Sequence, residues 1–109
     1  MTNGFTFQGE NTMNCYVYLL QCGDGTLYCG WTNDMRVRLA AHQSGRGAKY
    51  TRAHAPVIPV YLEQCADKSA ALRREHALKK LTRAQKLELI KAHAAESKAL
   101  LLSCHIASC

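Results

Sequence analysis

The sequence predicts an α+β domain, in which a small three-stranded antiparallel sheet is flanked by helices. Three β-branched, aromatic and aliphatic segments have strand composition, and the first two are separated by a tight turn. Segments with helical apolar spacing follow the second and the third of them. The expected order of elements is therefore β-β-α-β-α-α, with the helices packed on the sheet.

The strands are predicted at residues 14–22, 26–31 and 57–65. Asp24 and Gly25 both tolerate positive φ, so the first two strands are expected to form a hairpin. Gly30 inside the second strand indicates a close approach of another group to the backbone. Pro59 has no backbone N–H to donate, which favours an edge position or an irregular start for the third strand.

Helices are predicted at residues 35–42, from Asp67 or Ser69 to about Leu81, and from Thr82 onwards, where Thr82 and Gln85 form a capping box. Met35, Leu39 and Ala40 are expected on the inward face of the first helix. The segment 44–54 contains two glycines and predicts a loop. The chain then divides into an N-terminal arm (1–13), one domain (14–95) and a C-terminal extension (96–109).

Charge and composition predict a basic domain that binds polyanions. The 109 residues carry a formal charge of +6, and nucleic acid is the commonest partner of such a surface. No apolar run is long enough to span a membrane, and the first 14 residues lack the features of a secretory signal. We therefore expect a cytoplasmic monomer without membrane contact, whose six cysteines are free thiols.

Basic residues concentrate in two stretches. Between Met35 and Leu62 there are five Lys or Arg and no acidic residue, and the segment 44–54 mixes basic side chains with Gly, Ser, Thr and Tyr50. Such a segment can bind phosphates, while Tyr50 stacks on a base. The stretch from Lys68 to Lys91 is also basic, but an ordinary solvated helix surface explains it equally well.

A series of residues resembles the GIY-YIG nuclease family. Tyr16-Val17-Tyr18, then Tyr28-Cys29-Gly30, and then Arg38, His42 and Glu75 occur in the family's order and spacing over residues 14–90. The segment 42–51, with the later Leu-Arg-Arg-Glu of residues 72–75, is most similar to the small stand-alone bacterial members. Two positions depart from the family pattern: Tyr16 replaces a glycine, and Trp31 stands where excision-repair relatives have lysine.

This resemblance implies hydrolysis of DNA phosphodiester bonds with one divalent metal, Mg²⁺ or Mn²⁺, held by Glu75. Arg38 would neutralise charge on the phosphate, and Tyr18 would act as general base, with Tyr28 and His42 orienting the water. His42 is the alternative base or a proton relay. The expected DNA-binding residues are Gly30, Trp31, Thr32, Arg36, Arg46, Lys49, Tyr50 and Arg52.

The substrate and two other functions stay open from the sequence. A lone domain with one site suits single-stranded DNA, or flapped and branched DNA, better than double-strand cleavage. The first alternative is a nucleic-acid-binding module that has lost catalysis. The second is a thiol or metal protein, for which Cys104, His105 and Cys109 are the candidate ligands.

Overall fold

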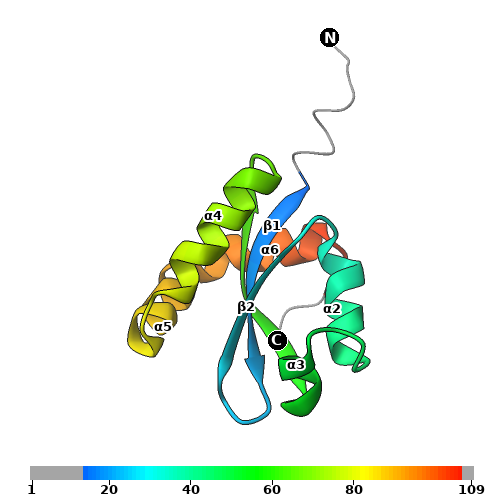
Figure 1. Ribbon diagram of the computed structural model, residues 1–109. Helices are drawn as coiled ribbons and strands as arrows, with labels where there is room; N and C mark the ends of the chain where they lie inside the picture. Colours follow the sequence, from blue (N-terminus) through cyan, green and yellow to red (C-terminus); the bar gives the residue numbers. More distant parts are fainter. Residues whose placement is uncertain (1–13, 107–109) are drawn as a thin grey trace.

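A three-stranded antiparallel sheet forms the centre of the computed structural model, which describes residues 14–106 (Figure 1). Strands β1 (Cys15–Cys22), β2 (Leu27–Thr32) and β3 (Val57–Cys65) lie in the order β2-β1-β3. The helices are α2 (Met35–Gln43), α3 (Lys49–Ala53), α4 (Lys68–Lys79), α5 (Arg83–Ala92) and α6 (Ala94–Ser103). The predicted α+β class is confirmed, whereas the predicted arm at residues 1–13 lies outside the described residues.

The strand register places alternate residues of the hairpin on opposite faces of the sheet. Tyr18 lies opposite Gly30 and Leu20 lies opposite Tyr28, so the two tyrosines share a face. The register of β3 shifts between Leu19 and Leu20, next to Pro59, and β3 is an edge strand, as the proline predicts. This alternation fixes which strand residues face α2 and which face α4.

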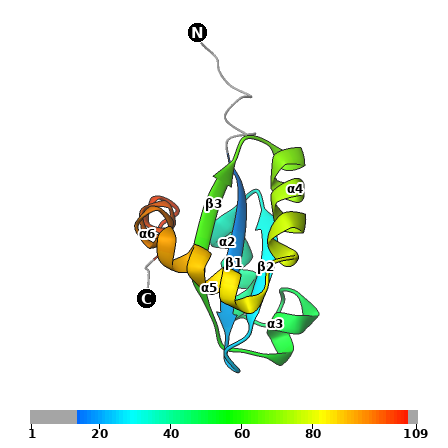
Figure 2. The same cartoon turned by 90° about the vertical axis from the view of Figure 1, so that its left-hand side faces the viewer.

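Two apolar clusters lie on the two faces of the sheet (Figure 2). One joins Tyr18 and Leu20 of β1 to α2 and α6, through residues that include Met35 and Leu101. The other joins Val17 of β1 and Tyr61 of β3 to Ala71 and Leu78 of α4, with part of α5. Each face of the sheet is therefore covered by helices, and β2 is left at one edge.

Local sequence signals place the helix starts correctly. The Asp34 and Asp67 side chains accept hydrogen bonds from backbone N–H groups at the starts of α2 and α4. Thr82 and Gln85 form both hydrogen bonds of the predicted capping box. Ala40 is exposed, however, so only Met35 and Leu39 of the predicted inward face are buried.

Two segments differ from the prediction. Residues 49–53, expected in a loop, form the short helix α3, and the C-terminal segment folds as a separate helix that begins at Ala94. Ser97 of α6 accepts a hydrogen bond from the backbone N–H of Leu62 at 3.1 Å, and Ile106 is buried against the sheet. The expected boundary at residues 95 and 96 therefore falls inside a helix that packs on β3.

The described residues also bear on the cysteines and on membrane contact. Within residues 14–106 five cysteines are present and all five are free thiols, as expected. Across that same range, no helix has the length and apolar character needed to span a bilayer.

Candidate active site

Helix α2 positions two of the predicted catalytic side chains. Arg38 and His42 are four residues apart, so both project from one side of the helix towards β1. The helix is fixed at its start, because Thr32 exchanges hydrogen bonds with Asp34, which in turn caps α2. Thr32, expected to bind DNA, is buried and holds this turn.

A continuous hydrogen-bonded chain runs through the buried face of the sheet. Nε of Arg38 donates to the Tyr18 hydroxyl at 3.4 Å, and that hydroxyl lies 2.8 Å from Nε2 of His42. Nδ1 of His42 lies 2.8 Å from the hydroxyl oxygen of Thr51 in α3. Tyr18 is 1% exposed, and His42 and Thr51 are completely buried.

The last hydrogen bond fixes the direction of the whole chain. The Thr51 hydroxyl donates to the backbone carbonyl of Ala48 at 2.9 Å, so its oxygen must accept from His42. His42 therefore carries its proton on Nδ1, and its Nε2 is a free acceptor. Tyr18 consequently donates its hydroxyl proton to His42.

Two glycines make room for this chain. A Cβ atom on Gly30 would lie 2.5 Å from the Tyr18 hydroxyl oxygen, and a Cβ atom on Gly47 would overlap the His42 ring. The close approach predicted at Gly30 is therefore confirmed, and its cause is Tyr18. Gly30, expected among the DNA-binding residues, lies against a catalytic candidate instead of facing solvent.

Burial sets the proton affinities of the two central groups. Burial raises the pKa of Tyr18 to about 12, although the neighbouring Arg38 favours the phenolate. Burial and the positive charge of Arg38 lower the pKa of His42 to about 4. At neutral pH, Tyr18 is thus protonated and His42 is neutral.

Three aromatic rings continue the site towards solvent. Tyr28 lies edge-on to His42, with ring centroids 5.4 Å apart, and stacks on Tyr50 at 6.0 Å. Tyr50 stacks in turn on His54 at 4.1 Å, and its hydroxyl donates to the Thr26 hydroxyl at 2.6 Å. The hydrogen bond of Tyr18, and then the neighbouring Tyr28, raise the pKa of Arg38, so Tyr28 adjoins the chain of Arg38, Tyr18 and His42.

Glu75 lies beside β2 on the face of the sheet that α4 covers. Its backbone carbonyl lies 3.9 Å from Sγ of Cys29, the neighbour of Tyr28 in the strand. Its carboxylate is 3.3 Å from Nζ of Lys79, and the side chain is 18% exposed. Glu75 is therefore beside the edge strand, separate from the chain of Arg38, Tyr18 and His42.

The side chains near Glu75 suit a metal ion that keeps most of its water ligands better than one held entirely by protein ligands. No cluster of three or more His, Cys, Asp or Glu able to hold a metal occurs between residues 14 and 106. Cys29 is not a thiolate, because burial and Glu75 raise its pKa to about 11. One partly exposed carboxylate suits Mg²⁺, which keeps several water ligands.

The alternative metal site predicted at Cys104, His105 and Cys109 has no such cluster among the described residues. Cys104 and His105 belong to none, and Cys109 lies outside the described residues.

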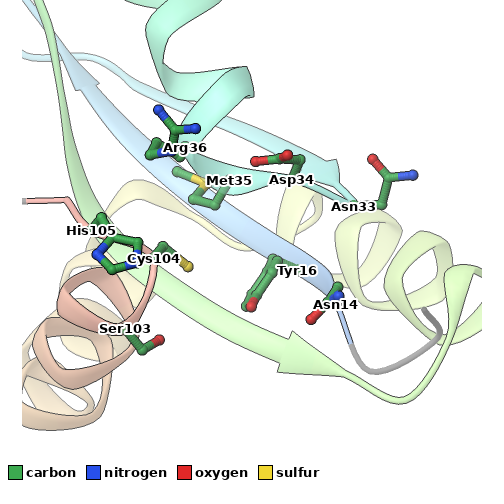
Figure 3. A pocket seen from close by; sticks show the side chains of 9 residues that line it. All are labelled: Asn14, Tyr16, Asn33, Asp34, Met35, Arg36, Ser103, Cys104 and His105. Atoms are coloured by element: carbon green, nitrogen blue, oxygen red, sulfur yellow. The ribbon is translucent and has the colours of Figure 1, made fainter. Parts of the chain in front are cut away.

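The remaining predicted residues are dispersed. Arg46, Lys49 and Arg52 are exposed on and around α3. Nζ of Lys68 lies over the Trp31 ring, 5.7 Å from the ring centroid. Arg36 lines a cavity of about 240 Å³ at the other side of α2, with Tyr16, Cys104 and His105 among its walls (Figure 3). This cavity is distinct from the chain that contains Tyr18 and His42.

No sequence pattern indicated a role in the site for Thr51 or His54. Thr51 and His54 belong to a segment without helical period, so no pattern distinguished them from ordinary loop residues. The spacing of nine residues between His42 and Thr51 carries no signal by itself.

An arginine bonded to a hydroxyl, an imidazole that accepts that hydroxyl's proton, and a carboxylate beside the edge strand are groups that phosphodiester hydrolysis can use. The GIY-YIG catalytic domain family matches residues 14–88, and the chain belongs to that family. GIY-YIG domains form an endonuclease family, act on nucleic acid and generally use a divalent metal.

Similar proteins cover most of the chain and are themselves small. A UPF0213 protein of Clostridium perfringens is 55% identical over 75 residues, which are 69% of this chain and 81% of the relative. A UPF0213 protein of Streptococcus sanguinis is 53% identical over 70% of this chain and 87% of its own length. The solution NMR structure of a UPF0213 protein of Bacillus halodurans matches with a TM-score of 0.51 and 41% identity, covering 75% of this chain and 87% of that one.

Proposed function

We propose that this chain is a metal-dependent endonuclease that hydrolyses DNA one strand at a time and prefers single-stranded DNA. The observation that supports this most is the directed chain from Arg38 through Tyr18 to His42. It joins a guanidinium group that can bind a phosphate to a hydroxyl whose own proton already has an acceptor.

Proton transfer along this chain avoids the formation of a free phenolate. With its pKa near 12, ionising Tyr18 at pH 7 costs about 7 kcal/mol. If Tyr18 passes its own proton to His42 while it takes one from the water that attacks the phosphate, neither a free phenolate nor a free hydroxide has to form. Tyr18 is therefore the base that contacts water, and His42 is the final acceptor.

Arg38 connects proton transfer to substrate binding. It is the half-buried neighbour of the Tyr18 hydroxyl, so a turn of its side chain towards a phosphate opens that hydroxyl to the attacking water. A divalent cation held by Glu75 would supply charge neutralisation for the phosphate and the leaving oxygen. Tyr28, beside both Arg38 and His42, orients the water.

The outer part of the site supports an unpaired substrate. Tyr50 is 39% exposed and stacks on His54, and flat aromatic surfaces of this kind bind bases that a duplex keeps stacked inside. Exposed Arg46, Lys49 and Arg52 lie around them and can contact phosphates. The proposed enzyme acts as a monomer.

Digestion of labelled single-stranded, duplex and flap DNA of matched sequence, with and without Mg²⁺, tests the proposal. We expect cleavage of the single strand and of the flap's free arm, dependent on Mg²⁺ and absent in Glu75→Ala. Glu88→Ala removes an exposed carboxylate of α5 and should cleave like the wild type. Binding without cleavage in every sample would favour the non-catalytic module, and faster cleavage of duplex would overturn the proposed substrate.

A further inference from the structure

A row of α4 side chains follows the edge strand β2, on the face opposite Tyr18. Lys68, Leu72, Glu75 and Lys79 are spaced so that they share one side of the helix. Contacts with β2 fix this side towards the strand, because Lys68 lies over the Trp31 ring and Glu75 lies against Cys29. Leu72, between them, is 41% exposed.

Helix α5 extends this row to the end of the hairpin. Arg83 donates from Nη1 to the carbonyl of Gly25 at 2.7 Å. Lys86 comes three residues after Arg83, so it shares the side of α5 that faces the hairpin, and its charge acts on Cys29 of β2. The basic residues of α4 and α5 therefore follow the same edge of the sheet as Glu75, and Lys79 pairs with it.

The hairpin turn joins this row to the aromatic rings. Arg83 of α5 holds Gly25, while Tyr50 of α3 holds the next residue, Thr26. Figure 1 shows α5 and α3 on either side of the hairpin formed by β1 and β2. A strand of nucleic acid that passes from the aromatic rings around Tyr50 across the edge of β2 would thus next contact the side chains of α4 and α5.

We propose that the α4–α5 row (Lys68, Leu72, Lys79, Arg83 and Lys86) binds a second stretch of the same nucleic-acid strand, on the far side of the cleaved bond from α3. Four of its five residues are cationic, and Glu75 is the acidic group among them. The exposed Leu72 and the half-buried Trp31 offer apolar contact to unpaired bases between the phosphate contacts. The inference rests on the proposed nucleic-acid substrate and adds the path of the strand.

A pair of charge-matched variants tests this path. Lys68→Gln/Lys86→Gln removes two charges of the row without touching Glu75 or its partner Lys79. Lys91→Gln/Lys98→Gln removes two exposed charges, of which Lys98 lines a cavity beside the opposite edge strand β3. The affinity of each variant for a labelled single-stranded oligonucleotide is measured over a range of salt concentrations. EDTA is present throughout, because it removes the divalent metal and so prevents cleavage during the measurement.

The row variant should flatten the slope of log K against log[salt] by about 1.4, at ~0.7 per phosphate contact, while the control pair leaves it unchanged. Equal slopes for the two pairs would overturn the inference. Because this experiment measures binding, its result does not depend on whether the protein cleaves DNA. A flatter slope in the row variant, with no cleavage by the wild type, would support binding by the row and contradict the proposed nuclease activity. Glu75-dependent cleavage with equal slopes would support the nuclease activity and contradict binding by the row.

Discussion

The hydroxyl of Tyr18 lies 2.8 Å from Nε2 of His42, 24 residues away in the sequence, and both side chains are buried. Because His42 is completely buried and its Nε2 faces the Tyr18 hydroxyl, the proposed route of a proton to Nε2 runs through Tyr18. The hydrogen bond between Nδ1 and Thr51 keeps Nε2 free for that proton.

Thr51→Val should impair the site at nearly constant volume. It removes the acceptor for Nδ1–H, so His42 either keeps a buried unsatisfied N–H or moves its proton to Nε2. We expect at least a tenfold loss of cleavage rate and a decrease of ~1–3 kcal/mol in the free energy of unfolding. Thr51→Ser, which keeps the hydroxyl, should retain the wild-type rate.

The ¹⁵N chemical shifts of the His42 ring supply a readout that packing alone does not move. They should report the Nδ1–H tautomer in the wild type and in Thr51→Ser, and a mixture or the other tautomer in Thr51→Val. An unchanged tautomer together with an unchanged rate in Thr51→Val would show that Thr51 does not position His42.

His42 should make stability fall in mild acid. Its folded-state pKa near 4 is below the unfolded value near 6.5, so the unfolded chain binds the extra proton between these limits. The free energy of unfolding should therefore decrease by up to about 3 kcal/mol from pH 6.5 to 4 on account of this group. Urea unfolding of wild type and His42→Gln across that range isolates the effect, which is refuted if both proteins show the same pH dependence.

The exposed cations around α3 should carry part of the salt dependence of binding. Replacing Arg46, Lys49 and Arg52 together by glutamine should flatten the slope of log K against log[salt] by about 2, at ~0.7 per contact on single strands. The Lys91→Gln/Lys98→Gln pair is the control for general charge loss. A slope equal to that of the wild type would mean that the strand does not contact α3.

Gly30→Ala should displace Tyr18 from its position. The added methyl group would lie 2.5 Å from the Tyr18 hydroxyl oxygen and 2.7 Å from the ring carbon that bears it, so the ring must move. Overpacking of this kind costs ~1–3 kcal/mol of stability. We also expect most of the cleavage rate to be lost, and a folded variant with full activity would contradict the position assigned to Tyr18.

The sequence determines much of this fold through local signals. Some signals involve residues no more than four apart, so they can be recognised in the sequence alone. They are the Asp24-Gly25 turn, the Asp67 cap and the Thr82 capping box. Strand alternation likewise places Tyr18 and Tyr28 on one face once the hairpin register is known. The family resemblance supplied the order of the catalytic candidates.

What the sequence left out depends on contacts between distant segments. Helix α3 is five residues long and follows two glycines, so its pattern is that of a loop. In the structure it is held by Tyr50 bonding to Thr26 and by Thr51 bonding to His42. The direction of the hydrogen-bonded chain, and with it the acceptor role of His42, follows only from those contacts.

The pH dependence of the single-turnover cleavage rate, for wild type and Tyr18→Phe at saturating Mg²⁺, tests the proton transfer from Tyr18 to His42 most directly. Tyr18→Phe should lower the rate by ~10² or more, because it removes the hydroxyl and leaves the ring. In the wild type, the acceptor is already neutral above about pH 5, given a His42 pKa near 4, so the rate should be level from pH 6 to 9. A rate that rises about tenfold per pH unit through this range, or a Tyr18→Phe variant that keeps most of its activity, would contradict the account.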